Sequence, residues 1–204
     1  MDITSIITAV TTLLSVAGVW GTVYYGRKSN KLEQRLRRFT WEDIGQGVSS
    51  LGNTAFRDFE PDLILSLSAP GAIVANLLLL ATGRFVPLYL GVSRKTGMPA
   101  LKGQPASSHV VITNRWIADV PDEVFRDPKR RILICEDCVV TGATLAGVVD
   151  LLQKAGYERE NIRTIALFTT DLAIQSQCGP DVHWMNVSET KFYLPWGQSL
   201  GRGY

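Results

Sequence analysis

From Phe39 onward, continuous apolar runs alternate with segments whose apolar residues recur at helical spacing. The runs have the length and composition of buried strands and lie at 62–67, 86–92, 109–113, 131–135 and 163–168. Helical patterns stand between them, from Thr40 through the fifties, at 73–81, and around Leu145, Val148, Val149 and Leu152. A polar stretch that contains Gly and Pro, 93–108, separates the second and third runs. Strands and helices that alternate at these lengths predict an α/β domain over 39–204, with a parallel sheet and right-handed crossovers.

Residues 3–25 differ from the rest of the chain, because none of them is charged. As a helix this segment would be about 34 Å long, enough to cross the hydrocarbon core of a membrane. A buried helix of a soluble protein is the alternative, but such a helix is seldom apolar on every side over this length. A cleaved signal peptide would carry basic residues before the apolar run, and here only Asp2 is charged there. We therefore expect a transmembrane helix within residues 1–26.

The charges that flank this segment predict its orientation. Residues 27–38 carry six basic side chains and one acidic side chain, and they indicate a short basic juxtamembrane helix that can rest on anionic headgroups. The positive-inside rule places that flank in the cytoplasm. We expect a single-pass protein of the cell (inner) membrane, with its N-terminus outside and its C-terminal domain cytoplasmic. Residues 39–204 keep 15 basic and 17 acidic side chains, which is not the charge of a nucleic-acid-binding domain.

Small and hydroxyl-bearing residues form a stripe along the predicted membrane helix. They are spaced alternately four and three residues apart, at Thr4, Thr8, Thr11, Ser15, Gly18 and Thr22. This period of about 3.5 keeps them on one side of a helix. Because lipid cannot satisfy hydroxyl groups and a neighbouring helix can, the stripe predicts a homo-oligomer. The alternative is that each hydroxyl bonds to a carbonyl of its own helix.

The cysteines indicate packing in the core rather than a zinc or redox site. The chain has three, Cys135, Cys138 and Cys178, an odd and sparse set that is typical of a reducing compartment. Cys135 and Cys138 form a C-x-x-C, which zinc and redox sites use. No second pair exists, and His109 and His183 stand apart from each other. We interpret Cys135 as a small core residue at the end of a buried strand.

The stretch 132–149, ILICEDCVVTGATLAGVV, joins a buried strand to a helix through two acids and a hydroxyl-rich turn. Ligands of parallel α/β sheets bind beyond the carboxyl ends of the strands, where Glu136 and Asp137 are expected. Adjacent carboxylates need cations or hydroxyl groups as partners, and a sugar diol supplies hydroxyls. Residues 141–144, Thr-Gly-Ala-Thr, are small enough for the backbone to wrap a phosphate, and their hydroxyls add donors. Together these features predict a site for a ribose 5-phosphate.

This order of apolar run, acid pair, two spacers and Thr-Gly-x-Thr resembles the signature motif of the type I phosphoribosyltransferases. FTWEDI (39–44) and PDLILSLSAPGAIVA (61–75) are similar to the family's entry helix, first strand and pyrophosphate loop. FYLPWG (192–197) is similar to the hood of its purine-type members. The resemblance implies a type I phosphoribosyltransferase-like domain that binds phosphoribosyl pyrophosphate or a nucleotide, with Mg²⁺. In an active member, the phosphoribosyl group passes to a purine-like base through an oxocarbenium-like state.

Carried over residue by residue, the resemblance assigns roles to the motif. Glu136 and Asp137 would be the catalytic acid pair that binds the ribose hydroxyls, and Asp137 would be a candidate ligand of the magnesium ion. The 5-phosphate would be held by Val140, Thr141, Gly142, Ala143 and Thr144. The pyrophosphate would be held by Ser68, Ala69, Pro70 and Gly71, assisted by Arg94 or Lys95. Trp196 would stack on the base.

Two positions depart from the family's pattern. Val140 stands where active members carry Thr, Ser or Asp, and it offers neither a donor nor a proton-transfer group. Pro70 removes a backbone donor from the pyrophosphate loop. Three functions therefore stay open: a membrane-anchored phosphoribosyltransferase, a non-catalytic nucleotide-sensing module, and a membrane effector or toxin. Phosphoribosyltransferase-like proteins also resemble effectors of bacterial antiviral defence systems, which would bring a protein or ribonucleoprotein partner.

Overall fold

A computed structural model of the chain describes residues 37–98, 109–188 and 192–198. The chain divides into two units, Met1–Arg38 and Phe39–Tyr204. The predicted membrane segment 3–25, with its stripe of small residues, and residues 27–36 of the basic segment lie outside the described residues. Within the described ranges, no helix combines the length and the apolar character that a membrane crossing requires.

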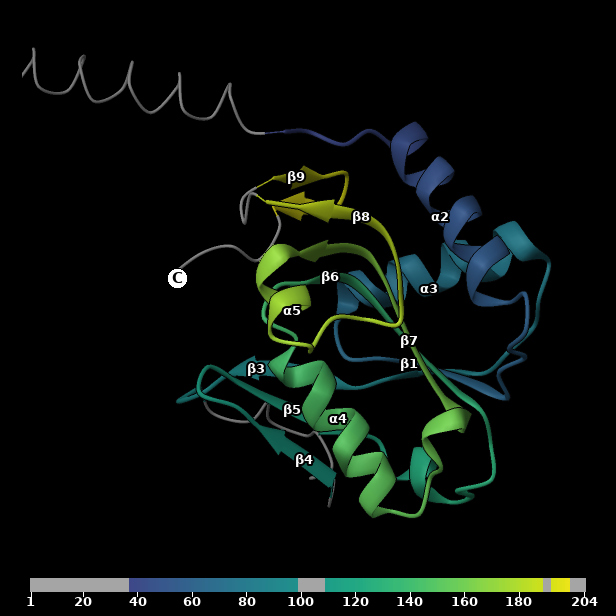
Figure 1. Cartoon of the computed structure of the whole chain (residues 1–204), viewed down its shortest axis with the longest axis vertical. Helices are drawn as coiled ribbons and strands as arrows, with labels where there is room; N and C mark the ends of the chain where they lie inside the picture. The colour runs from purple at the N-terminus through teal and green to yellow at the C-terminus, as the bar shows by residue number, and fades with distance from the viewer. Residues whose placement is uncertain (1–36, 99–108, 189–191, 199–204) are drawn as a thin grey trace, which may run out of the picture. The chain divides into compact units, whose positions relative to one another are not determined.

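A parallel sheet of five strands forms the centre of the domain, in the order β2-β1-β6-β7-β8 (Figure 1). The strands are β1 (Leu63–Ser66), β2 (Leu88–Leu90), β6 (Ile132–Val139), β7 (Ile162–Thr170) and β8 (Val182–Val187). Each neighbouring pair is parallel, which confirms the predicted parallel α/β sheet for four of the five predicted runs. The prediction was wrong for the run 109–113, which pairs in a separate antiparallel sheet. The continuous apolar runs of β1 and β6 follow from this position, because inner strands of such a sheet are covered on both faces.

Helices cover the two faces of the sheet. They are α2 (Trp41–Ala55), α3 (Ala69–Thr82), α4 (Ala143–Lys154) and α5 (Asp171–Gln175), with short 3₁₀ helices η1 (Asp122–Phe125) and η2 (Arg159–Asn161). Successive side chains of a strand point to opposite faces. Leu133 and Cys135 of β6 therefore join the core under α2 and α3, whereas Ile132 and Ile134 join the core under α4.

Two helix starts illustrate how local sequence sets these elements. Thr40 caps α2 as predicted: its side chain accepts a hydrogen bond from the Asp43 N–H at 3.2 Å, and the Asp43 carboxylate accepts one from the Thr40 N–H at 2.8 Å. The start of α3 differs from the prediction. The helix begins at Ala69 rather than at residue 73, because Ser68 caps it and proline fits its first turn.

A second sheet of three antiparallel strands packs beside the first. Its strands are β3 (Val92–Lys95), β4 (His109–Ile112) and β5 (Trp116–Val120), in the order β3-β5-β4. The predicted strand 86–92 is in fact split at Gly91, whose N–H donates to the Ser66 carbonyl at 2.7 Å while β3 turns to pair with β5. Helix α4 packs on this sheet so closely that a Cβ at Gly147 would come within 2.5 Å of the Val111 side chain.

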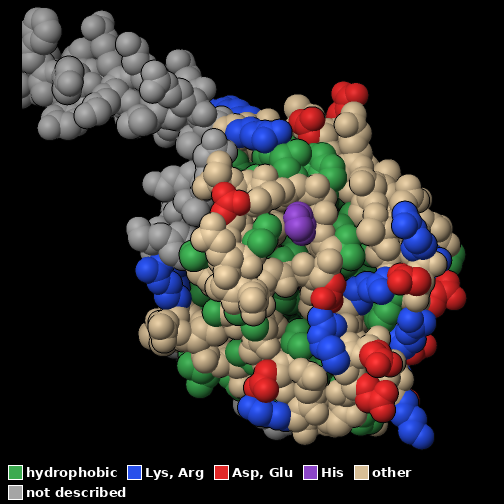
Figure 2. Space-filling model, in the orientation of Figure 1, with side chains coloured by type: hydrophobic (Ala, Val, Ile, Leu, Met, Phe, Trp, Pro, Cys, Tyr) green, Lys and Arg blue, Asp and Glu red, His purple; other side chains and the backbone are tan. Residues whose placement is uncertain are grey.

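A short hairpin of β9 (Tyr193–Leu194) and β10 (Gly197–Gln198) completes the described part of the domain. It is tied to the start of the domain, since the Phe39 N–H donates to the Tyr193 carbonyl at 2.9 Å. On the face that Figure 2 shows, Lys and Arg side chains are interspersed with Asp and Glu side chains. This mixture agrees with the near-balanced charge of residues 39–204.

Candidate functional site

The acid pair lies inside a central strand. We predicted Glu136 and Asp137 beyond a strand that ends at residue 135, whereas β6 continues to Val139 and includes both acids. Because neighbouring strands and helices cover β6, Glu136 is only 9% exposed and Asp137 only 5% exposed. The two carboxyl groups are therefore surrounded by protein groups, and their hydrogen-bond partners determine which of them can contact a ligand.

The turn after β6 depends on a glycine. Gly142 adopts a φ of 72°, in the left-handed region that side chains disfavour, and it directly precedes α4. A Cβ at this position would lie 1.9 Å from the carbonyl oxygen of Cys178, so any side chain would collide with backbone. Helix α4 begins here without a side-chain cap. The backbone is thus close-packed at Gly142, and within the turn the Ala143 N–H donates to the Thr141 hydroxyl at 3.4 Å.

One cavity joins this turn to the acid pair. It has a volume of about 120 Å³, and we call it the inner cavity. Its lining consists of Leu67, Ser68, Ser93, Trp116, Glu136, Cys138, Val139, Val140, Thr141, Gly142, Thr144 and Leu145. The structure therefore brings together Glu136, Ser68 and four of the five predicted phosphate-binding residues. Ala143, the fifth, is exposed at the start of α4.

Glu136 is held by the junction between β1 and α3. One carboxyl oxygen accepts a hydrogen bond from the Leu67 N–H at 2.6 Å, and the other accepts one from the Ser68 hydroxyl at 2.7 Å. The Ser66 hydroxyl lies 3.5 Å from the first oxygen. Donors from the end of β1 and from Ser68, the first residue of the predicted pyrophosphate loop, thus converge on Glu136. This acid therefore holds the junction between β1 and α3 as well as lining the cavity.

The two acids titrate at different pH values. Burial raises the pKa of Glu136 to about 8, and the charge of Asp137 adds to the rise, against the hydrogen bonds from Ser68, Leu67 and Ser66. Burial also raises the pKa of Asp137 to about 6, against the hydrogen bond from Trp196. Both carboxyl groups therefore keep a proton to a higher pH than an exposed carboxyl group does.

Asp137 faces the β9–β10 hairpin, which includes Trp196, rather than the inner cavity. The indole N–H of Trp196 donates to its carboxylate at 3.4 Å, and Asp137 does not line the cavity. The Trp196 ring also contacts that of Trp41, with 5.8 Å between the centroids. The predicted base-stacking residue and the predicted ribose ligand therefore contact each other in this structure, although 59 positions separate them in sequence.

The predicted pyrophosphate loop is the first turn of α3. The Ser68 hydroxyl accepts a hydrogen bond from the Gly71 N–H at 3.0 Å, and the Ser68 N–H donates to the Ser66 hydroxyl at 3.4 Å. Pro70 has no N–H. Of the four residues predicted to offer backbone here, only Ala69 keeps an N–H for which the described structure gives no acceptor, and Ala69 is exposed.

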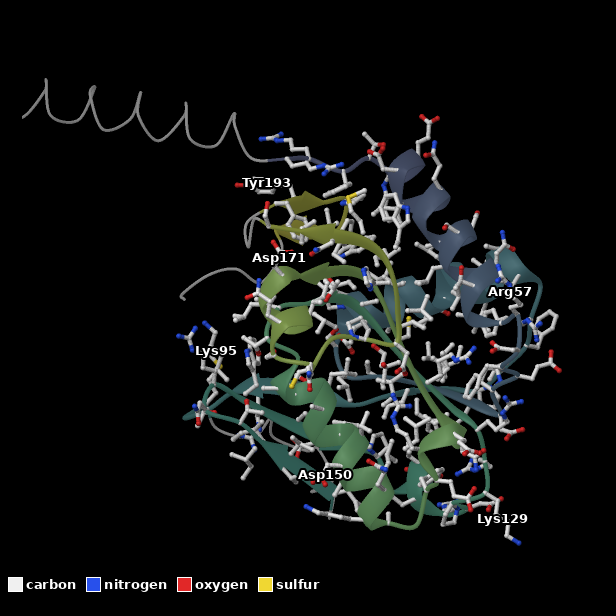
Figure 3. The ribbon with its side chains drawn as sticks, viewed as in Figure 1. Arg57, Lys95, Lys129, Asp150, Asp171 and Tyr193 are labelled. Atoms are coloured by element: carbon white, nitrogen blue, oxygen red, sulfur yellow. The ribbon has the colours of Figure 1, made fainter. Side chains whose placement is uncertain are left out.

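Arg94 and Lys95 belong to strand β3. Arg94 donates to the Met98 carbonyl at 2.9 Å and lies 3.7 Å from the Asp119 carboxylate, on the face opposite Ser93. Lys95 is exposed at the end of β3, at the edge of the molecule (Figure 3). Ser93, which we did not predict, is the β3 residue that lines the inner cavity.

Trp116 is a second lining residue that sequence reasoning missed. It opens β5, and it borders both the inner cavity and an adjoining cavity of about 440 Å³, which we call the outer cavity. The outer cavity is lined by Thr113, Asn114, Arg115, Trp116, Thr141, Ala143 and Thr144. The available signal was a tryptophan beside a Thr-Asn-Arg turn, but we predicted no strand there.

The residues that the structure describes do not form a metal site of their own. No group of three or more His, Cys, Asp or Glu side chains among them is placed to hold an ion. Cys135 lies in the core, where burial raises the pKa of its thiol, in agreement with its interpretation as a core residue.

Comparisons with known proteins show which sequences and folds the chain resembles. An adenine phosphoribosyltransferase of Clavibacter sepedonicus is 29% identical over 148 residues, which cover 63% of this chain and 75% of that protein. A purine phosphoribosyltransferase of Pyrococcus horikoshii superposes with a TM-score of 0.56 at 21% identity, over 78% of this chain and 92% of that chain.

A hypothetical protein of Neisseria gonorrhoeae with bound ppGpp superposes with a TM-score of 0.58 at 14% identity, over 79% of this chain and 89% of that chain. No family model matches the chain. The structural likenesses show the fold, and the sequence match extends the likeness to a curated relative. The chain is therefore phosphoribosyltransferase-like, and its described domain has the α/β fold of the purine-type members of that family.

Proposed function

We propose that the chain binds a 5-phosphorylated ribose, as phosphoribosyl pyrophosphate or as a nucleotide, in the inner cavity. The observation that carries this proposal is the shared lining: Glu136 and residues 140–142 and 144 border one hollow. The Gly142 backbone can approach a phosphate closely, and the hydroxyls of Thr141 and Thr144 supply further donors. The resemblance also assigns Asp137 to the ribose hydroxyls. In this structure Asp137 accepts from the Trp196 indole and does not line the cavity, so the proposal requires its carboxylate to turn from Trp196 toward the ligand.

Transfer of the phosphoribosyl group to a purine-like base is the finer form of this proposal. The sequence likeness to an adenine phosphoribosyltransferase supports it. Three features favour binding without turnover. Val140 offers no side-chain donor, Pro70 offers no backbone donor, and the N–H groups of Ser68 and Gly71 are engaged by serine side chains. A non-catalytic nucleotide-sensing module is therefore the second candidate, and the fold likeness to a protein with bound ppGpp supports it.

Binding and turnover assays on the full-length chain in detergent test these functions. We expect calorimetry to detect phosphoribosyl pyrophosphate or a nucleotide, and Asp137→Asn to weaken binding about tenfold or more by removing a charged acceptor. Asp150→Asn is the matched control, because Asp150 is exposed near the far end of α4 and pairs with Lys154 (Figure 3). It should bind as the wild type does.

Release of pyrophosphate over a panel of purine bases then separates the two candidates. Turnover that Asp137→Asn abolishes supports the transferase, and tight binding without turnover supports the sensor. If neither phosphoribosyl pyrophosphate nor any nucleotide binds, the proposal is wrong. We also propose a membrane anchor and a homo-oligomer, which rest on the uncharged segment 3–25 and its stripe of small residues. A partner from a defence system rests on the resemblance to phosphoribosyltransferase-like effectors.

A further inference from the structure

The outer cavity is the larger of the two hollows around the phosphate loop. It shares Trp116, Thr141 and Thr144 with the inner cavity, so the two adjoin. The inner cavity continues from these residues toward Glu136 and Ser68, where the ribose is proposed to bind. The outer cavity continues instead toward the turn between β4 and β5. A ligand that ended at its first phosphate would leave the outer cavity to water.

The turn that borders the outer cavity is firmly built. The Trp116 N–H donates to the Thr113 hydroxyl at 3.0 Å, and the Thr113 N–H donates to the Trp116 carbonyl at 2.8 Å. The Arg115 carbonyl accepts a hydrogen bond from the Thr96 N–H at 2.9 Å. These bonds hold the tip of the turn, Asn114 and Arg115, beside Thr141 and Thr144 across the cavity.

The chemistry of the lining indicates an anion. The lining contains a guanidinium group, a carboxamide, three hydroxyl groups and an indole, and it contains no carboxylate. Arginine is the side chain best matched to phosphate oxygens, because its planar fork can donate two parallel hydrogen bonds. A second anionic group covalently joined to the first phosphate would thus meet suitable donors in the outer cavity.

We propose that the ligand is a nucleoside 5′-diphosphate or 5′-triphosphate, with its first phosphate at residues 140–144 and its next phosphate in the outer cavity against Arg115. This inference rests on the proposed function and deepens it, because it names the class of ligand. It also separates this site from one that needs only a 5-monophosphate, since the outer cavity adds contacts that a monophosphate cannot reach.

Calorimetry on the full-length chain in detergent tests the proposal with AMP, ADP and ATP, and with GMP, GDP and GTP. In at least one series, the diphosphate should bind about tenfold more tightly than the monophosphate. Arg115→Gln should remove this preference and leave the affinity for the monophosphate unchanged. Arg126→Gln is the matched control, because Arg126 is likewise an exposed arginine and does not line the cavity, and it should keep the preference.

The outcomes distinguish the outer-cavity site from the proposed function. Equal affinity for monophosphates and diphosphates in the wild type, or a preference that survives Arg115→Gln, overturns the outer-cavity site while the proposed function stands. If the chain binds neither phosphoribosyl pyrophosphate nor any nucleotide of either series, both fail.

Discussion

At the scale of single residues, Glu136 is both a buried acid of a central strand and the hydrogen-bond acceptor for a neighbouring loop. It lies in the central strand β6 with 9% of its surface exposed, yet its carboxyl group receives hydrogen bonds from Leu67 and Ser68. The resemblance assigns it to the ribose hydroxyls, whereas its contacts here join β6 to the start of α3. Burial favours the neutral form of this acid, whereas the hydrogen bonds from Leu67 and Ser68 favour the ionised form, and burial is the larger effect.

The raised pKa of Glu136 predicts how stability depends on pH. In the unfolded chain this carboxyl group loses its proton near pH 4.5, and in the folded chain near pH 8. The folded state therefore binds more protons between these values, so the free energy of unfolding should fall as pH rises through this window, by a few kcal/mol. Chemical denaturation of the ligand-free protein over a pH series measures the fall.

Glu136→Gln should remove most of that fall and leave a shallower one between about pH 4 and 6, where Asp137 titrates. Glu123→Gln, at an exposed position, is the control and should keep the wild-type profile. A wild-type stability that rises between pH 5 and 8 would contradict the prediction.

The hydrogen bond from Trp196 to Asp137 leads to a second prediction, that ligand binding depends on pH. Affinity for phosphoribosyl pyrophosphate should increase as pH rises through about 6, because ionised Asp137 is the better acceptor for ribose hydroxyls. The indole N–H lowers the pKa of Asp137, so Trp196→Phe should move this midpoint to higher pH while it keeps an aromatic ring. Calorimetry at several pH values is the measurement. Trp41→Phe changes only a ring that touches Trp196, and a shift of equal size in both variants would count against the idea.

At the scale of elements, the phosphate loop is a turn that two distant segments define together. Strand β6 ends at Val139, directly before the turn, and the Cys178 backbone packs against Gly142. The loop can therefore adopt its shape only if α4 and the segment after α5 are both in place. Close packing of this kind excludes any side chain at position 142 and fixes the backbone of the turn.

Gly142→Ala tests this arrangement. The new Cβ would need both a left-handed backbone and a position 1.9 Å from the Cys178 carbonyl. We expect a loss of about 1–3 kcal/mol in the free energy of unfolding, and loss of binding to phosphoribosyl pyrophosphate and nucleotides. Gly83→Ala is the matched control, because Gly83 also has a positive φ but a Cβ there would meet nothing within 4 Å. It should lose about 1 kcal/mol and bind normally, and normal binding by Gly142→Ala would contradict the proposed loop.

At the scale of the whole molecule, the domain from Phe39 onward and the N-terminal segment differ in their pattern of apolar residues. The domain buries its apolar strands between α2 and α3 on one face and α4 on the other. The segment 3–25 is apolar on all sides and carries a stripe of small residues. We predict that it anchors the chain in the membrane and brings copies of it together.

Membrane fractionation and chemical crosslinking test this prediction. The full-length chain should stay with the membranes after a high-salt wash, and deletion of residues 1–26 should release it. In detergent, the intact chain should crosslink into oligomers, and replacement of Thr8, Thr11 and Ser15 by leucine should reduce them while membrane association persists. Release of the intact chain by salt, or oligomers that survive deletion of residues 1–26, would overturn the respective part.

Periodicity predicted β1, β6, β7 and α4 because each shows its pattern within a few residues, and the parallel sheet followed from their alternation. It missed β5 and β8, whose side chains are only partly buried and whose apolar residues do not form a continuous run. It also set α3 to begin four residues too late, since it treated Ser68 and Pro70 as a turn instead of as a cap and a first-turn proline.

The order of residues along the chain establishes that an acid pair and a Thr-Gly-x-Thr turn stand between a buried strand and a helix, because those features are contiguous. Which groups those acids meet depends on how the chain folds. Glu136 receives donors from residues about seventy positions earlier, and Asp137 receives the Trp196 indole from 59 positions later. Ser93, Trp116 and Arg115 border the cavities because a second sheet packs against α4. Hydrophobic periodicity cannot predict such contacts. The partner of a side chain depends on how the sheets and helices pack against one another, and not on its neighbours in sequence.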